Sequence, residues 1–471
     1  MMIPNYTLYQ SPFSWRYASN EMRTLWSEEH KRKLWRKIWV ALAKVQSEFG
    51  LLPSQILKEL EAKQNEINLE RALEIEKLIH HDLMAELQCF SEQCPNAGGF
   101  LHIGATSMDI EDNAEVIRLR EALEILINKL DDLLALTAQK IRLYAEIPSL
   151  AFTHLQPAEP TTLGYRIAGF AQELLLHSQN MRDLKKNLRG KGFKGAVGTA
   201  ASYVEILGLH HFDKFEQKMG EALQLSFFPV STQTYPRIQD YQVLVTLAGL
   251  GATLYKFAFD LRLLQSPLYG EWNEPFSEKQ VGSSAMPFKR NPIQAEKIDS
   301  LARLLASLPQ VAWENAAHSL LERTLDDSAN RRTILPEAFL IADELLLTAI
   351  RILKGLKVNT NAIERNLQVY APFSASERLL MKLVQKGANR QEMHEVIREH
   401  SMRAWLEVTA GKPNPLFTLL QSDERVTIFL NDEEISECQN IQSYTGIATL
   451  RAQQIAEAIE KYLQASGTYS P

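Results

Sequence analysis

Apolar residues recur at steps of three and four along most of this chain, which is the spacing of one face of an α-helix. The clearest stretch is residues 113–147, which contain neither Gly nor Pro. Its apolar stripe consists of Val116, Leu119, Leu123, Leu126, Leu130 and Leu133. We expect Asp112 to cap this helix and Pro148 to stop it. The same pattern predicts long helices over 21–50, 161–188, 236–265, 292–318 and 327–356, the last of them bent at Pro336.

Five of these helices lie in the middle of the chain, and most are far longer than the usual mean of about 11–12 residues. They predict an all-α fold built on a central helical bundle. Apolar stripes on more than one face indicate that the bundle also buries surface against other subunits. No convincing run of alternating strand residues and no internal repeat is visible. We expect three helical domains: an N-terminal domain over 1–111, the bundle over 112–360 and a C-terminal domain over 361–471.

The composition is that of a soluble globular protein: 471 residues, 45% hydrophobic and 23% charged, with a formal net charge of −6. This charge gives no support to a nucleic-acid surface, so an anionic substrate would need a local cluster of Arg and Lys. The three cysteines are an odd number without metal-ligand spacing, which favours free thiols in a reducing cytoplasm. We expect no signal peptide at the N-terminus and no membrane-spanning segment.

One stretch carries more chemistry than the rest, residues 277–292, with the sequence SEKQVGSSAMPFKRNP. Gly282, Pro287 and Pro292 predict a loop, and Pro292 suits the first turn of a following helix. Serine hydroxyls beside the fixed cations Lys289 and Arg290 could bind a carboxylate and move a proton. An ordinary polar connector has a similar composition, but the order GSSxMPxKxNP resembles the signature loop of the fumarase/aspartase superfamily, which implies a catalytic loop.

Two further motifs contain candidate polar groups. His154, in THLQP, stands where we expect a loop to enter the second central helix, and its pKa suits acid–base work near neutral pH. Thr106 and Ser107 follow Gly104 beside a helix start, where hydroxyl groups can bind a carboxylate. Taken alone, His154 could bond only to its own turn, and the two hydroxyl residues could form a simple cap.

Three more clusters are ambiguous when taken separately. His80, His81 and Asp82 could include a His–Asp couple, although neighbouring residues on a helix point about 100° apart, so at most one histidine would face a site. Residues 322–332 are rich in phosphate-type donors, namely arginine forks and a serine hydroxyl, but could equally be a surface salt-bridge patch. Arg16 and Tyr17 place a cation beside an aromatic ring.

Together the motifs resemble the adenylosuccinate lyase family of the fumarase/aspartase superfamily. The matching strings occur in the family's order and cover nearly the whole chain: SPFSWRYAS, IHHDLMAEL, HIGATSMDIEDNA, FTHLQPAEPTTLG, KGFKGAVGTAASY, QVGSSAMPFKRNP, ERTLDDSANRR and GANRQEMHEVIREHS. The loop signature indicates only the superfamily. The strings around Arg16 and Arg323 narrow the resemblance to the adenylosuccinate branch, because they supply a nucleotide-phosphate site.

The resemblance implies cleavage of adenylosuccinate to AMP and fumarate, and of succinylaminoimidazole carboxamide ribotide (SAICAR) to AICAR and fumarate. It also implies an all-helical, three-domain fold and a cytoplasmic homotetramer whose active sites each draw residues from three subunits. No metal, organic cofactor, nucleic acid or membrane is implied. Removal of a proton beside a carboxylate builds a doubly charged aci-carboxylate, which fixed donors must stabilise.

Residue by residue, the resemblance implies that Ser284 is the general base and His154 the general acid. Lys289 holds a succinyl carboxylate, and His81 binds substrate while pairing with Glu296. The implied substrate contacts are Arg16, Tyr17, His80, Asp82, Thr106, Ser107, Asn291, Lys297, Arg323, Ser328 and Arg332.

The chain departs from the family pattern at a few positions. Ala200 stands where some relatives have a glutamine that contacts substrate, and both His80 and Lys297 stand where several carry arginine. These changes concern the balance between the two substrates. Two other classes of function remain open: a related fumarate-releasing enzyme such as an argininosuccinate lyase, which would not need Arg323 and its phosphate cluster, and a lyase scaffold that has lost catalysis and serves as a binding protein.

Overall fold

The computed structural model describes residues 7–467, which form two compact units. The first unit comprises 7–129, 177–252 and 300–347, and the second comprises 130–176, 253–299 and 348–467. Each unit is therefore assembled from three separate segments, and the divisions between units fall within long helices. The three-domain division expected from the sequence stays a prediction.

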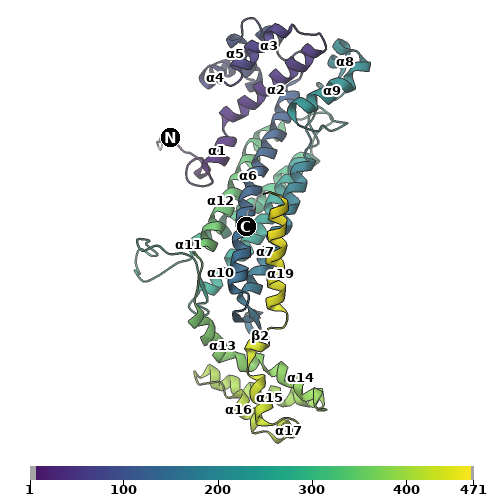
Figure 1. Cartoon of the computed structure of the whole chain (residues 1–471). Coiled ribbons are helices and arrows are strands. Elements are labelled where there is room, and N and C mark those ends of the chain that lie inside the picture. Colours follow the sequence, from purple (N-terminus) through teal and green to yellow (C-terminus); the bar gives the residue numbers. More distant parts are fainter. Residues whose placement is uncertain (1–6, 468–471) are drawn as a thin grey trace. The chain divides into compact units, whose positions relative to one another are not determined.

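Five long helices dominate the chain, and the predicted all-α class is confirmed (Figure 1). They are α6 (Ser107–Tyr144), α7 (Leu163–Asn187), α10 (Ile238–Gln265), α11 (Ile293–Ala317) and α12 (Asp326–Gly355). Four of them end within about two residues of the predicted bounds, and α6 begins six residues earlier than expected. By length and composition α10 could cross a membrane, and half of its most apolar window is buried inside the structure; a single helix of this kind is weak evidence, because core helices meet the same criteria.

Shorter helices complete the first unit. They are α1 (Asn20–Leu25), α2 (Glu28–Glu48), α3 (Leu57–Lys63), α4 (Leu69–Ile79), α5 (Asp82–Gln93), α8 (Ala201–Leu207) and α9 (Leu209–Leu223). The single helix predicted over 21–50 is in fact two, because the Ser27 hydroxyl accepts a hydrogen bond from the backbone N–H of His30 and starts a new helix. Helix α5 is fastened to α2 inside the protein: Glu86 accepts hydrogen bonds from Arg36 over 2.6 Å and Arg32 over 3.0 Å.

The second unit contains short strands that the sequence analysis did not predict. Strands β1 (Pro148–Thr153) and β2 (Gln156–Thr162) form an antiparallel hairpin, and β3 (Trp272–Asn273) pairs antiparallel with β4 (Lys357–Val358). Helix α13 (Thr360–Ser374) packs on both strands of the hairpin. Three prolines in 148–162 obscure the strand pattern, because proline cannot donate to a β-ladder.

Six further helices complete the chain, and α14 to α18 share a core of their own. They are α14 (Ser376–Gln385), α15 (Arg390–Thr409), α16 (Leu416–Gln421), α17 (Glu424–Thr427), α18 (Asp432–Cys438) and α19 (Ala448–Ala465). Buried Leu379, Leu383, Phe417 and Ile435 lie at the centre of the cluster that joins α14 to α18. Burial of such side chains stabilises the fold by about 1.5–3 kcal/mol each. Single 3₁₀ turns lie at Pro12–Ser14, Ser54–Ile56, Gly98–Phe100 and Ile441–Ser443.

Candidate active site

The signature loop, residues 274–292, connects β3 to α11 and is closed by contacts between its two sides. The side-chain Nδ2 of Asn291 donates a hydrogen bond to the carbonyl oxygen of Gly282 over 2.8 Å. A Cβ atom at position 282 would lie only 2.0 Å from the carbonyl oxygen of Lys289, so glycine is required there. The predicted loop is therefore confirmed, with Pro292 immediately before α11.

The two serines of this loop differ in what they contact. The Ser283 hydroxyl accepts hydrogen bonds from the backbone N–H groups of Ala285 and Met286, over 3.3 and 3.1 Å. The Ser284 side chain is exposed, and within residues 7–467 its hydroxyl has no hydrogen-bond partner. Lys289 is likewise exposed, and its ammonium group has no partner in the same range. The loop therefore presents one hydroxyl and one cation that are available to a ligand.

A buried carboxylate anchors the base of the loop, and the sequence analysis missed it. Glu274 accepts hydrogen bonds from the backbone N–H groups of Gln294 and Ala295, over 3.1 and 3.0 Å, at the start of α11. Burial raises the pKa of Glu274, although these hydrogen bonds act in the opposite direction. Gln265, at the end of α10, accepts from the backbone N–H of Glu274 and donates to the carbonyl oxygen of Arg290. Both ends of the loop are thus fixed, while its centre is exposed.

His154 lies at the tip of the β1–β2 hairpin, so its predicted place at the mouth of a helix is wrong. Thr153 pairs with Gln156, which leaves His154 and Leu155 as a two-residue turn. Their φ angles are 54° and 59°, the left-handed values that such a turn requires and that Asn or Gly usually supplies. Both side chains are exposed. His154 and Leu155 thus both have unfavourable backbone conformations, and these conformations place the His154 imidazole in solvent. Strain of this kind is typical of functional sites.

In the first unit, His81 and Ser107 are in contact. His81 caps α5, and its Nδ1 accepts a hydrogen bond from the backbone N–H of Met84 over 3.5 Å. Its Nε2 forms a hydrogen bond with the Ser107 hydroxyl over 3.3 Å. The expectation that His80 and His81 lie on one helix is wrong. His80 ends α4 with a φ of 55°, and His81 stands before α5. Thr106 precedes α6, and its backbone N–H donates to the Asp109 carboxylate over 3.0 Å.

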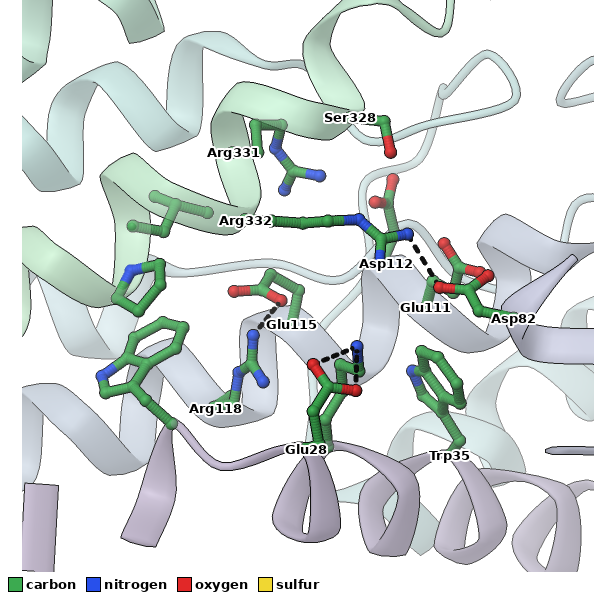
Figure 2. Close-up of a pocket in the computed structure, with 14 residues that line it drawn as sticks. Glu28, Trp35, Asp82, Glu111, Asp112, Glu115, Arg118, Ser328, Arg331 and Arg332 are labelled. Carbon is green, nitrogen blue, oxygen red and sulfur yellow. Dashed lines mark hydrogen bonds and ion pairs between the residues drawn. The ribbon is translucent and has the colours of Figure 1, made fainter. Parts of the chain in front are cut away.

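A pocket is lined by residues of α2, α5, α6 and α12, and these include Asp82, which follows His81 in the sequence (Figure 2). Asp82 accepts a hydrogen bond from Arg332 over 2.7 Å. Burial alone would raise the pKa of Asp82, but the hydrogen bond and charge of Arg332 hold it below its usual value. Ser328 also lines the pocket, and its hydroxyl has no hydrogen-bond partner within the described chain. The pocket thus offers an arginine fork and a free hydroxyl, which suit a phosphate group.

The pocket also contains Glu111, which the sequence analysis did not select. Burial, with help from the charges of Asp82 and Asp112, raises the pKa of the Glu111 carboxyl to about 8. Figure 2 draws it beside Asp82 and the guanidinium group of Arg332. A carboxyl group with this pKa is mostly protonated at neutral pH.

The predicted cap at Asp112 is wrong, because α6 begins at Ser107 and Asp112 lies buried in its second turn. Asp112 accepts hydrogen bonds from Arg237 over 3.0 Å and from the backbone N–H of Tyr235 over 2.8 Å. Arg237 also donates to Asp327 over 2.7 Å, and Asp327 accepts from Arg323 over 2.8 Å. The residues around 323–331 are therefore partly engaged in ion pairs, but these pairs are largely buried and include partners outside the cluster, unlike the surface salt-bridge patch left open by the sequence.

The sequence-predicted residues divide between the two units. The first unit holds Arg16, Tyr17, His80, His81, Asp82, Thr106, Ser107, Arg323, Ser328 and Arg332, and the second holds His154, Ser284, Lys289, Asn291, Glu296 and Lys297. Asp82, Ser328 and Arg332 line the pocket, whereas Arg16, Tyr17 and Arg323 lie outside its lining. Glu296 is exposed in the first turn of α11, followed by half-buried Lys297. The His81–Glu296 pair would join different units and stays a prediction. Ala200 is buried before α8.

Two solved structures share the fold of this chain at low sequence identity. A solved fumarate lyase from Mesorhizobium sp. BNC1 matches 96% of this chain and 99% of its own at a TM-score of 0.83 and 24% identity. A solved 3-carboxy-cis,cis-muconate lactonizing enzyme from Pseudomonas putida matches 96% and 100% at a TM-score of 0.85 and 23% identity. At these identities the likeness shows the fold alone.

Sequence comparison is more specific. The family model described as Lyase matches residues 17–305, and the one described as Adenylosuccinate lyase C-terminus matches 372–455. The adenylosuccinate lyase of Schistosoma mansoni is 41% identical over 88% of each chain. That of Saccharomyces cerevisiae is also 41% identical, over 90% of this chain and 89% of its own, and that of Pyrococcus horikoshii is 35% identical over 96% and 98%. The resemblance drawn from the motifs is confirmed: this chain belongs to the adenylosuccinate lyase family.

Proposed function

We propose that this protein cleaves the carbon–nitrogen bond of adenylosuccinate, releasing fumarate and AMP, and that it cleaves SAICAR to AICAR and fumarate in the same site. Both reactions would serve purine nucleotide biosynthesis in the cytoplasm. The main support is the signature loop, in which Ser284 and Lys289 have no side-chain hydrogen-bond or ion-pair partner among residues 7–467. The pocket lined by Arg332 and Ser328 could bind the phosphate group of such a substrate. The relatives are named adenylosuccinate lyases, which agrees with this substrate.

The chemistry assigned to these residues is a β-elimination. Ser284, as an alkoxide, removes a proton from the carbon beside a succinyl carboxylate. The electron pair of the broken carbon–hydrogen bond then forms the new carbon–carbon double bond of fumarate. The carbon–nitrogen bond breaks, and the leaving nitrogen takes a proton from the His154 imidazolium. The carboxylate gains charge as the proton leaves, and the ammonium group of Lys289 stabilises that charge.

Serine is a weak base in water, so the loop must change its surroundings. The Ser284 side chain is exposed, and the cations Lys289 and Arg290 follow it within the same loop. Closure of the loop over substrate would exclude water and strengthen the effect of these cations on the hydroxyl. The anchors at Glu274 and Gln265 allow such a movement, because they hold the ends of the loop and leave its centre free.

We further propose a homotetramer with shared active sites. The long helices carry exposed apolar side chains that a solitary chain would leave in water: Leu176 on α7 is 53% exposed and Phe259 on α10 is 51% exposed. A second subunit that covers these faces would remove them from solvent. The exposure of His154 and Ser284 agrees with sites that are completed by neighbouring subunits.

The test is an absorbance assay of the purified protein with adenylosuccinate, argininosuccinate and malate as separate substrates. We expect turnover of adenylosuccinate alone, with AMP and fumarate as products. Turnover of argininosuccinate instead would favour the second candidate, an enzyme that needs no phosphate site. A folded protein that cleaves none of the three would indicate a scaffold that has lost catalysis. Light scattering at micromolar concentration tests the tetramer, which a monomer would contradict.

A further inference from the structure

The charged side chains that line the Arg332 pocket are arranged in opposite pairs. Three pairs lie between residues of the lining, with N–O distances of 2.7–2.9 Å: Lys31 with Glu28, Arg118 with Glu115, and Arg332 with Asp82. They come from α2, α6, and from α12 with α5 (Figure 2). Each of these charges is therefore compensated within the pocket before any ligand arrives.

The two deeper lining charges are paired with residues behind the pocket wall. Asp112 pairs with Arg237 over 3.0 Å, and Arg331 pairs with Asp240 over 2.8 Å. The side chains of both pairs are at most 13% exposed, so each of these two lining charges is balanced by a buried counter-charge.

Glu111 is the exception among the ionisable residues that line the pocket. Within the described chain it has neither an ion pair nor a hydrogen bond, although Asp82 and Asp112 lie close enough to influence its charge. It also stands one helical turn before Glu115 on α6, a spacing at which two negative charges repel each other. The geometry thus places one surplus carboxyl group where every positive charge already has a partner, and the raised pKa of Glu111 agrees with this arrangement.

We propose that Glu111 must keep its proton for a phosphate group to bind beside Arg332 and Ser328, so that this residue sets the upper pH limit of phosphorylated-ligand binding. This inference rests on the proposed function for the identity of the ligand as a nucleotide. A neutral Glu111 leaves the lining without net charge and can donate its proton to a phosphate oxygen. An ionised Glu111 can no longer donate a proton to the phosphate, and its negative charge repels the incoming anion. Both effects oppose binding.

The sign of the pH dependence follows from the same charges. Raising the pH from 7.5 to 9 converts most Glu111 to the carboxylate, and we expect AMP to bind roughly eightfold more weakly to the native protein. Adenosine, which lacks the phosphate, should show no such loss. In Glu111→Gln the side chain stays neutral at both pH values, so AMP affinity should be nearly constant. Glu115→Gln is the matched control: it removes a carboxylate from the same helix and pocket, and we expect the native loss of affinity to remain.

Calorimetry of the full-length protein measures these affinities. Buffers with different enthalpies of ionisation add a readout that needs no variant. Binding of AMP at pH 8 should take up about half a proton per site, because the bound anion holds Glu111 in its protonated form. No proton uptake by the native protein, or the same loss of AMP affinity in Glu111→Gln as in the native protein, would overturn the proposal.

Inorganic phosphate serves as a second probe, which separates this inference from the proposed function. Glu111→Gln is the reference, because it responds only to the change in the charge of phosphate itself between the two pH values. Relative to this variant, the phosphate-dependent rise in the unfolding temperature of the native protein should be larger at pH 7.5 than at pH 9. The same pH dependence in the native protein and in Glu111→Gln would contradict the role of Glu111 even if adenylosuccinate is cleaved. Conversely, the expected phosphate result without any cleavage of adenylosuccinate would overturn the proposed function and leave the role of Glu111 supported.

Discussion

Ser283 and Ser284 are neighbours in the signature loop, but only the Ser283 hydroxyl is held by the protein. It accepts hydrogen bonds from two backbone N–H groups, whereas the Ser284 hydroxyl is exposed and has no partner within the described chain. The two hydroxyl groups therefore have different roles, one in the conformation of the loop and one in chemistry.

Replacing Ser284 with alanine should lower the turnover of adenylosuccinate by about 10²–10⁴-fold, the usual effect of removing an acid–base group. The oligomeric state and the unfolding temperature should not change, because the hydroxyl has no hydrogen-bond partner among the described residues. Ser283→Ala is the matched control, and it should loosen the loop and reduce turnover far less. If Ser283→Ala proves the more damaging of the two, the base has been assigned to the wrong serine.

The sequence predicted the long helices and the signature loop because both depend on local information. Apolar steps of three and four located α7, α10, α11 and α12 nearly to the residue. Gly and Pro marked the loop, and Gly282 is indeed required by the close approach of the Lys289 carbonyl. The start of α6 could also have been predicted, because Thr106 and Asp109 have the spacing of a capping box. Asp112 is also a suitable N-cap residue, and it was chosen instead.

The rest of the site depends on contacts between residues far apart in the chain, which no local pattern reveals. Asp112 binds Arg237, 125 residues away, and Asp82 binds Arg332, 250 residues away. The hairpin that carries His154 was missed because its turn lacks Gly and Asn. The role of Glu111 could not be predicted either, since it depends on every neighbouring charge having another partner.

Replacing His154 with asparagine should separate its chemistry from its backbone conformation. Asparagine adopts a positive φ readily, so the turn should form and the free energy of unfolding should change by no more than about 1 kcal/mol. Turnover should nevertheless fall by about 10²–10⁴-fold, because no acid remains to protonate the leaving nitrogen. The adjacent Leu155→Asn makes the same backbone substitution without removing the imidazole and should retain turnover. Equal turnover in the two variants would exclude His154 as the acid.

Replacing Gly282 with alanine should displace the signature loop without unfolding the protein. The new Cβ would meet the Lys289 carbonyl oxygen at 2.0 Å, which forces the two sides of the loop apart and removes the hydrogen bond from Asn291. We expect turnover to fall by about 10²-fold or more, since small displacements at a reacting centre have effects of this size. Limited proteolysis should cut the loop faster in the variant. An equal rate of cleavage and native turnover would show that the contact is not needed.

The Asp82–Arg332 pair should contribute to stability in a pH-dependent way. The folded pKa of Asp82 lies below its usual value of about 3.9. The pair therefore stabilises the fold at any pH above the unfolded pKa, and this stabilisation is lost as the pH falls through the folded pKa. Asp82→Asn removes the titrating group, so its unfolding midpoint in urea should decline less than that of the native protein between pH 5 and pH 3. Parallel declines would show that the pair contributes nothing.

Glu86 should be far more important for stability than any exposed acid on the same helices. Its carboxylate binds Arg36 and Arg32, and all three side chains are almost completely buried. Glu86→Gln leaves the buried guanidinium group of Arg36 without a counter-charge and leaves Arg32 only its longer pairs with Glu76 and Glu28, which should lower the free energy of unfolding by about 3–5 kcal/mol. The control is Glu29→Gln, whose exposed pair with Lys33 should contribute less than about 1 kcal/mol.

Because Glu86 fixes α5 to α2, and α5 begins at Asp82, the Glu86 variant should also bind AMP more weakly at a temperature where it remains folded. Unchanged AMP affinity would show that the position of Asp82 does not depend on this buried pair.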